Sequence, residues 1–170
     1  MPNHCYQQVH IHGPRFLVRE LYGHLTGKAD PEFCQVIKPM PFEQWLAPKT
    51  RSQNGYEIAG WYDWRLNNWG TKWDVCDVQI TQPLTIHDDE EDVAPESMNA
   101  SFSFNCWTAW SPPVPVWDAL VGMGLSVDAD YQDEGMNFEG TYLNGEEKMW
   151  EPEFEEDENG DLIQKELGDA

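Results

Sequence analysis

The sequence predicts an α+β fold in which two strand–helix–strand units share one antiparallel-rich sheet, with two main helices on one face. Strict alternation of apolar and polar residues marks the strands, and amphipathic stretches between them mark the helices. The length of 170 residues suits one domain with its own core. Two such units in one sheet define a ferredoxin-like sandwich. We place this domain at residues 1–154, with a tryptophan-rich insertion at 39–74.

The first unit begins with an alternating strand at residues 8–12. Pro14 opens a helix at the position where proline is tolerated, and Gly27 can end it. A second strand is expected at residues 33–37. The insertion that follows is irregular, apart from a short helix at residues 42–46.

The second unit begins with a strand at residues 76–80, which we expect Pro83 to end. A further strand is expected at residues 101–107. Ser111 then caps a helix that carries two prolines in its first turn. The next alternating strand lies at residues 125–131.

A C-terminal hairpin is expected after the second unit. It joins strands at residues 136–142 and 148–154 through Asn144 and Gly145, a pair typical of a type I′ turn. Residues 155–170 are acidic and have too few apolar residues to fold alone, so we expect this tail to be disordered.

The second face of the sheet is expected to be polar and partly open. Alternation places five residues on it: His10, His12, Asn105, Asp128 and Asp130. We expect the tryptophan-rich insertion to cover part of this face.

The net charge of −21 is concentrated in two segments. Residues 88–96 contain six acids and no base, and residues 146–170 contain eleven acids and two lysines. Such a charge repels nucleic acid and attracts basic surfaces, so direct binding of nucleic acid is not expected. The segments are either solvated tails or a surface for a basic partner. The candidate residues of that surface are Asp88, Asp89, Glu90, Glu91, Asp92, Glu155, Glu156, Asp157 and Glu158.

The stretch at residues 60–74 contains four tryptophans. Two of them, three positions apart, share one face of a short helix that Gly70 can end. Indoles this close together form either the nucleus of a core or the floor of a pocket, and the sequence leaves both open. In a pocket they would stack on a flat ligand such as a nucleotide base. The candidate ligand-binding residues are Trp61, Trp64, Arg65, Trp69, Lys72, Trp73 and Trp107.

Metal-binding and catalytic patterns are weak. His10 and His12 project to one strand face with His4 nearby, but no recognised zinc spacing accompanies them. The acids Asp128, Asp130, Asp133 and Glu134 do not have the spacing of a calcium loop, and we interpret them as a solvated strand face. The sequence contains no nucleophile turn, HExxH or phosphate loop. We therefore expect no metal, no cofactor and no enzymatic activity.

The N-terminus and the cysteines predict the cellular compartment. The chain starts without a basic, apolar signal segment and contains no apolar run long enough to span a membrane, so we expect a cytosolic protein. Cys5, Cys34, Cys76 and Cys106 form no CxxC pair, and we expect buried, reduced thiols.

Four segments carry a resemblance to a known family: MPNHCYQQVHIHG, NNWGTKWD, WTAWSPPVPVWDAL and YQDEGMNFEG. They are similar to the YubB ferredoxin-like family encoded by phages and plasmids, over about residues 1–143. The NWGTKWD block is the most specific element. The chain departs from the family in having His4 where tryptophan is usual, and in its acidic tail. The resemblance implies a ferredoxin-like fold and a mobile-element origin, and it transfers no catalytic residue.

Charge and resemblance together predict a phage or plasmid protein in the cytoplasm of a bacterial host. We expect it to be a non-enzymatic binder whose acidic surface engages a basic host protein, such as one that itself binds nucleic acid. Anti-defence proteins that mimic DNA act in this way. The alternative is a protein that binds or sequesters a nucleotide in the tryptophan-rich pocket.

Overall fold

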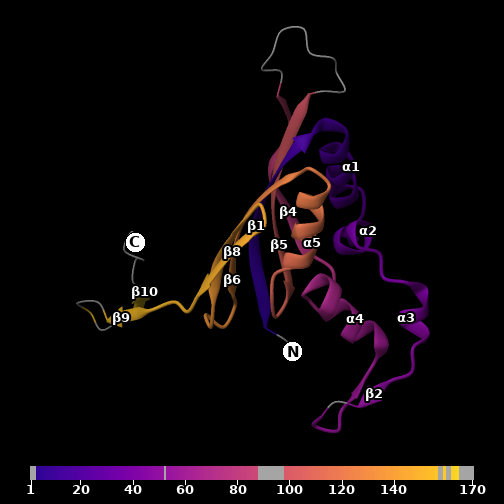
Figure 1. Ribbon diagram of the computed structural model, residues 1–170. Helices are drawn as coiled ribbons and strands as arrows, with labels where there is room; N and C mark the ends of the chain where they lie inside the picture. Colours follow the sequence, from indigo (N-terminus) through magenta and orange to yellow (C-terminus); the bar gives the residue numbers. More distant parts are fainter. Residues whose placement is uncertain (1–2, 52, 88–97, 157–158, 160–161, 165–170) are drawn as a thin grey trace.

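The fold is built on one antiparallel sheet of six strands in the order β4–β5–β1–β6–β7–β8 (Figure 1). This computed structural model describes residues 3–51, 53–87, 98–156, 159 and 162–164. The strands are β1 (His4–Pro14), β4 (Cys76–His87), β5 (Asn99–Ala109), β6 (Ser126–Asp133), β7 (Glu139–Leu143) and β8 (Glu146–Trp150). Strand β1 is central and pairs with β5 on one side and β6 on the other. The predicted α+β class is confirmed.

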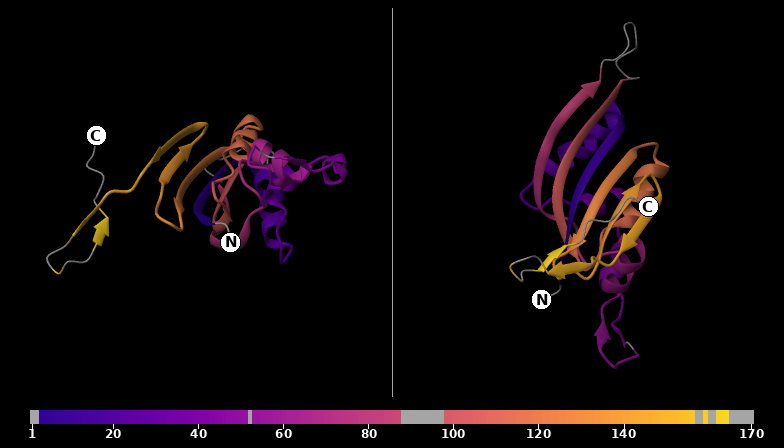
Figure 2. Two further views of the ribbon diagram at one scale, coloured as in Figure 1. Left: turned by 90° about the horizontal axis from the view of Figure 1, so that it is seen from below. Right: turned by 90° about the vertical axis from the view of Figure 1, so that its left-hand side faces the viewer.

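The helices lie on one side of this sheet and leave the other side bare (Figures 1 and 2). They are α1 (Arg15–Thr26), α2 (Phe33–Ile37), α3 (Phe42–Leu46), α4 (Gly60–Trp69) and α5 (Val114–Gly122). The core forms between the sheet and α1, α2 and α5. Its fully buried members include Ile11, Val18, Phe102, Phe104, Trp117 and Leu120.

Two small hairpins extend from this body (Figure 1). One pairs β2 (Thr50–Arg51) with β3 (Glu57–Ile58) ahead of α4. The other pairs β9 (Phe154–Glu156) with β10 (Leu162–Gln164), beyond the edge strand β8. The predicted disorder of the tail is therefore wrong for these two strands. Apart from Asn159, the remaining tail residues lie outside the described residues, as does the acidic loop at 88–96.

The predicted strand at residues 33–37 is wrong, because Phe33–Ile37 is helix α2. Phe33, Cys34 and Ile37 are buried together. The carboxylate of Asp74 accepts hydrogen bonds from the backbone N–H groups of Cys34 and Gln35, at 2.7 and 2.9 Å. A side chain forty residues away therefore supplies acceptors to the otherwise unpaired donors at this helix start.

Strand β4 is longer than predicted, because it continues through Pro83 to His87. β4 lies at the edge of the sheet, and its register with β5 shifts between Gln82 and Thr85, on either side of the proline. Proline is tolerated at edges and bulges, where its missing N–H breaks no ladder hydrogen bond.

The C-terminal hairpin forms around the predicted turn. Asn144 and Gly145 have φ values of +50° and +99°, the left-handed pair that a type I′ turn needs. The strand after it ends at Trp150, earlier than predicted. In the part of the chain that the structure describes, no helix has the length and apolar character needed to cross a membrane.

Three of the cysteines are buried free thiols, as expected: Cys5, Cys34 and Cys106. Cys76 is half-buried and also free. Burial raises the pKa of the Cys5 thiol to about 12.

Candidate functional site

The predicted helix in the tryptophan-rich stretch is α4, which Gly70 ends in the left-handed conformation. The N–H of Gly70 donates to the carbonyl oxygens of Arg65 and Leu66, both at 3.2 Å. Helix α4 packs against α3 and α5, on the helical side of the sheet (Figure 1). The insertion therefore does not cover the polar face, contrary to our expectation.

Trp69 belongs to the core. Its side chain is fully buried, and its indole N–H donates to the carbonyl oxygen of Lys38 at 2.8 Å. The ring of Trp64 meets it edge-on at 5.9 Å. These two tryptophans join α4 to the segment after α2, and neither lines any of the three cavities described below.

Arg65 is surrounded by aromatic rings. Its guanidinium lies 5.0, 5.2 and 4.7 Å from the ring centres of Trp45, Trp61 and Trp69. Partial burial lowers its pKa, although the nearby Asp74 acts in the opposite direction. Such cation–π contacts stabilise a desolvated guanidinium. Arg65 is thus positioned to hold α3 and α4 together.

Lys72 lies in a second set of aromatic rings. Its ammonium is 5.8, 5.6 and 5.3 Å from the ring centres of Tyr62, Trp73 and Trp110. Trp73 also reaches the ring of His4, 6.0 Å away at the start of β1. Of the seven predicted ligand-binding residues, Trp61 and Lys72 line one common cavity in the described part of the chain.

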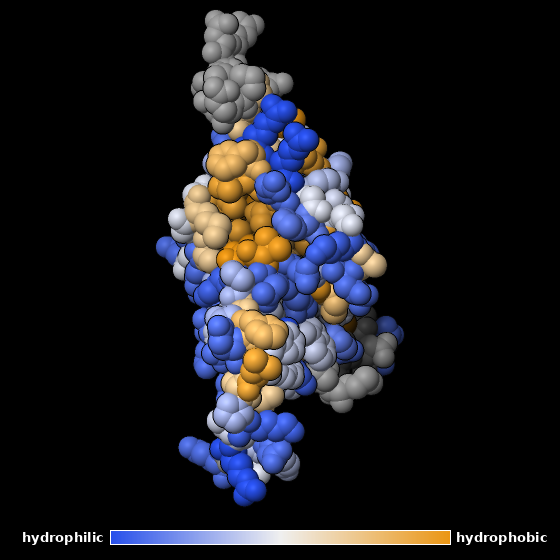
Figure 3. Space-filling view, turned by 90° about the vertical axis from the view of Figure 1, so that its right-hand side faces the viewer, coloured by the Kyte–Doolittle hydropathy of each residue, from blue (hydrophilic) through white to orange (hydrophobic). Residues whose placement is uncertain are grey.

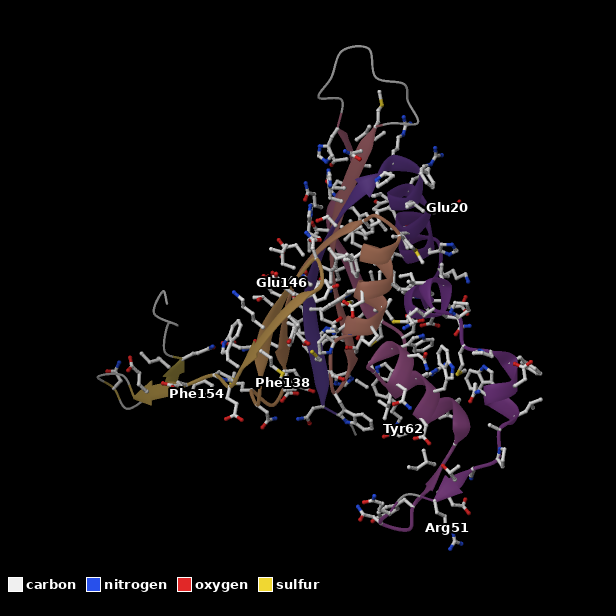
Figure 4. The ribbon with its side chains drawn as sticks, in the orientation of Figure 1. Glu20, Arg51, Tyr62, Phe138, Glu146 and Phe154 are labelled. Carbon is white, nitrogen blue, oxygen red and sulfur yellow. The ribbon has the colours of Figure 1, made fainter. Side chains whose placement is uncertain are left out.

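That cavity, of about 520 Å³, lies between the β2–β3 hairpin and α4. Its lining is Lys49, Tyr56, Glu57, Ile58, Ala59, Trp61, Tyr62 and Lys72. Lys49 pairs with Glu57 at 3.3 Å. Tyr62 projects from α4 toward this end of the molecule (Figure 4). Sequence reasoning missed Lys49 and Tyr56, because no periodic pattern connects the hairpin to α4.

The bare face of the sheet carries a second and more polar site, which we call the open face. The right panel of Figure 2 looks onto it. As alternation predicted, His10, Asn105, Asp128 and Asp130 line it. Two adjacent hollows of about 330 and 300 Å³ share Gln8 and Asp130. The second hollow adds Tyr6, Gln132, Glu139, Thr141 and Trp150.

The histidines of the open face have separate partners. His10 Nδ1 lies 2.8 Å from Ser103 Oγ, and His87 Nε2 lies 2.8 Å from Ser101 Oγ. The ring of His12 lies 5.6 Å from that of His87. His4 Nδ1 instead lies 3.1 Å from a carboxylate oxygen of Glu134. Among the residues that the structure describes, no group of three or more His, Cys, Asp or Glu is arranged to hold a metal.

Ser103, His10 and Asp128 lie in one row across β5, β1 and β6. A hydrolytic triad requires the acid to orient the imidazole by a hydrogen bond. Within the described set of contacts, His10 is bonded to Ser103 and not to Asp128. We interpret this row as a polar lining of the open face, and the expected absence of enzymatic activity stays a prediction.

The four acids at residues 128–134 do not form one cluster. Asp128 and Asp130 are exposed on the open face, whereas Asp133 is buried on the opposite side and accepts a hydrogen bond from the N–H of Asn137 at 3.2 Å. Burial and the neighbouring Asp128 raise the pKa of Asp130. In the described part of the chain neither the Asp128 carboxylate nor the Asp130 carboxylate has a hydrogen-bond or ion-pair partner.

Charge is segregated along the chain. The six strands of the sheet carry seven acids and one base, Lys148. Residues 73–147 contain sixteen acids and no lysine or arginine. Eight of the ten bases precede residue 73, on helices α1 and α4 and on the loops and small hairpin that follow α1. The helical side also exposes apolar residues, which form patches in Figure 3.

The predicted acidic surface is described only in part. Glu155 is exposed on β9, and Glu156 belongs to the same strand. The other members, Asp88, Asp89, Glu90, Glu91, Asp92, Asp157 and Glu158, lie outside the described residues.

Comparison with family models, with curated proteins and with solved structures found no match to this chain. The fold and the geometry above therefore define an α+β protein with one acidic open sheet face, and they carry the functional argument.

Proposed function

We propose that this chain is a phage or plasmid accessory protein that acts in the cytoplasm of a bacterial host and binds a basic host protein. It is a non-enzymatic binder of the anti-defence type, and its acidic surface takes the place of nucleic acid. We further propose a ferredoxin-like core made of β1, α1, β4, β5, α5 and β6. The strand order β4–β5–β1–β6, with both connecting helices on one face, supports this assignment.

The observation that carries the function is the segregation of charge. The open face, where Asp128, Asp130 and Glu139 line the hollows and Lys148 is the one base on the six strands, produces a negative potential that attracts a basic surface and repels nucleic acid. Glu155 on β9 extends this charge beyond the edge of the sheet. The segments at residues 88–96 and 157–170 contribute further acids to the net charge of the protein.

The test is capture of host proteins on the immobilised full chain, eluted in steps of salt and identified by mass spectrometry. We expect basic, nucleic-acid-binding proteins that elute between about 50 and 500 mM salt, because screening weakens such attraction. A chain ending at Phe154 should retain less of them. Retention that is indifferent to salt, or of proteins without basic surfaces, would refute the proposal.

Charge-neutralised variants locate the binding surface. Asp128→Asn with Asp130→Asn removes two charges from the open face, and Glu20→Gln with Glu43→Gln removes two from the helical side. Glu20 and Glu146 mark the two sides in Figure 4. Because all four replaced side chains are exposed, both variants should fold. Only the variant with Asp128→Asn and Asp130→Asn should release its partner at a lower salt concentration than the wild type.

A second candidate function is the binding of a nucleotide in the cavity beside α4. Aromatic rings and two lysines line that one cavity, which suits a flat, anionic ligand. Nucleotides should quench the indole fluorescence of the full chain. Lys49→Gln should weaken this response, whereas Arg51→Gln, a control on the same hairpin, should not. An absence of quenching by any nucleotide tested, or equal losses from both variants, would argue against this function.

A further inference from the structure

The two hollows of the open face form one groove across the sheet, since they share Gln8 and Asp130. The first hollow reaches Thr81 on β4, and the second reaches Trp150 on β8. The groove therefore spans all six strands. Five gaps of about 4.8 Å between neighbouring strands make a length of about 24 Å, which about seven residues of extended chain would cover.

The chemistry of the groove suits a cation. Asp128 and Asp130 lie on its floor, two positions apart on β6, and have no partner among the described side chains. Side chains two apart on a strand point to the same face and are separated by about 7 Å. The carboxylates therefore remain free to accept hydrogen bonds from two positive groups or from one planar guanidinium.

The second hollow adds aromatic surface. Tyr6 lines it and lies 5.0 Å from the ring of Trp107, and Trp150 lies at its far end. The indole N–H of Trp150 donates to Glu139 at 2.6 Å, which holds this ring at the groove. Guanidinium groups stack on aromatic faces and pair with carboxylates through two parallel hydrogen bonds. This combination favours arginine over lysine.

The β9–β10 hairpin contacts one end of the groove. The side-chain amide of Gln164 on β10 donates to Glu139 at 2.6 Å. Glu155 lies on the paired strand β9, next to Phe154, which is opposite Gln164. Lys148 is opposite Thr141 on the same face, so the positive charge nearest the groove lies at the β8 end. Cations should therefore bind nearer Asp128 and Asp130 than β8.

We infer that the groove binds an extended, arginine-rich segment of a partner protein, about seven residues long. This inference rests on the proposed function and specifies which part of the basic partner is recognised. Asp128 and Asp130 accept hydrogen bonds from its guanidinium groups, and Tyr6 and Trp150 supply aromatic faces for stacking.

The experiment measures binding of a fluorescently labelled hepta-arginine peptide to the full chain by fluorescence anisotropy. A hepta-citrulline peptide, which has nearly the same shape without the charge, serves as the ligand control. We expect hepta-arginine to bind more tightly than hepta-lysine and hepta-citrulline not to bind. Binding of citrulline and arginine peptides with equal affinity would overturn the inference.

Protein variants distinguish binding in the groove from attraction by the net charge of the protein. Asp128→Asn with Asp130→Asn should weaken hepta-arginine binding about tenfold, as expected for the loss of two partly exposed ion pairs. Glu20→Gln with Glu43→Gln makes the same change in net charge on the helical side. At about 0.15 M salt it should lower the affinity for hepta-arginine by less than about twofold. Lys148→Gln should tighten binding. Equal losses from the two double variants would show attraction by net charge alone and would overturn the groove assignment.

The result also distinguishes this inference from the proposed function. If basic host proteins are captured in a salt-dependent way but hepta-arginine does not bind the groove, the inference fails and the proposed function stands. If the peptide binds the groove but no basic protein is captured from the host, the proposed function fails. Thermal melting of each variant checks that a loss of binding does not reflect unfolding.

Discussion

Replacing Trp69 with phenylalanine tests whether the tryptophan-rich stretch is core. Trp69→Phe retains an aromatic ring but removes the N–H that donates to the Lys38 carbonyl oxygen. Leaving that carbonyl without its partner costs about 1–2 kcal/mol, and the smaller ring leaves a cavity worth about 1 kcal/mol. The free energy of unfolding should therefore fall by about 2–3 kcal/mol. In a chain of this length, that lowers Tm by about 5–10 °C.

The assay is urea unfolding followed by far-ultraviolet circular dichroism, which does not depend on the indole that is removed. Trp45→Phe is the matched control, since Trp45 also lies against Arg65 but is 51 % exposed. It should change the free energy of unfolding by less than about 0.5 kcal/mol. If Trp69→Phe were as mild as this control, the assignment of Trp69 to the core would be wrong.

Four further predictions follow from the packing. Asp74→Ala should lower the free energy of unfolding by about 2–3 kcal/mol, because it leaves the first N–H groups of α2 unpaired. Burial raises the pKa of Asp74 above 3.8, so the stability of the wild type relative to Asp74→Asn should fall as pH rises through that raised pKa, as seen in urea unfolding at several pH values. Gly70→Ala should destabilise more than Gly124→Ala: both glycines have positive φ, but only at Gly70 would a new Cβ lie 2.9 Å from Pro115 Cδ. Thermal melting compares the two, and equal losses would contradict the contact. In the native protein a thiol reagent should modify half-buried Cys76 before buried Cys106, and simultaneous modification would refute this order.

The sequence alone determined the parts of the fold that depend on local periodicity and turn chemistry. Alternation placed Val9 and Phe104 in the core and His10 and Asn105 on the open face. Asn144 and Gly145 form the predicted turn, because these residues adopt positive φ at little cost. The same alternation, extended two residues toward the N-terminus from the predicted strand at 8–12, would have found Tyr6 in the groove.

Only the tertiary structure decided between local states that are close in energy. Residues 33–37 form a helix because Asp74, distant in the sequence, accepts hydrogen bonds from the backbone at its start. Pro83 stays within a strand because that strand is at the sheet edge. Trp69 belongs to the core because α4 packs against other helices, and no local sequence pattern encodes that long-range contact. Trp107, in contrast, lies on the open face beside Tyr6. The open-face groove likewise depends on strand order, since side chains from six strands meet there only after the sheet has formed.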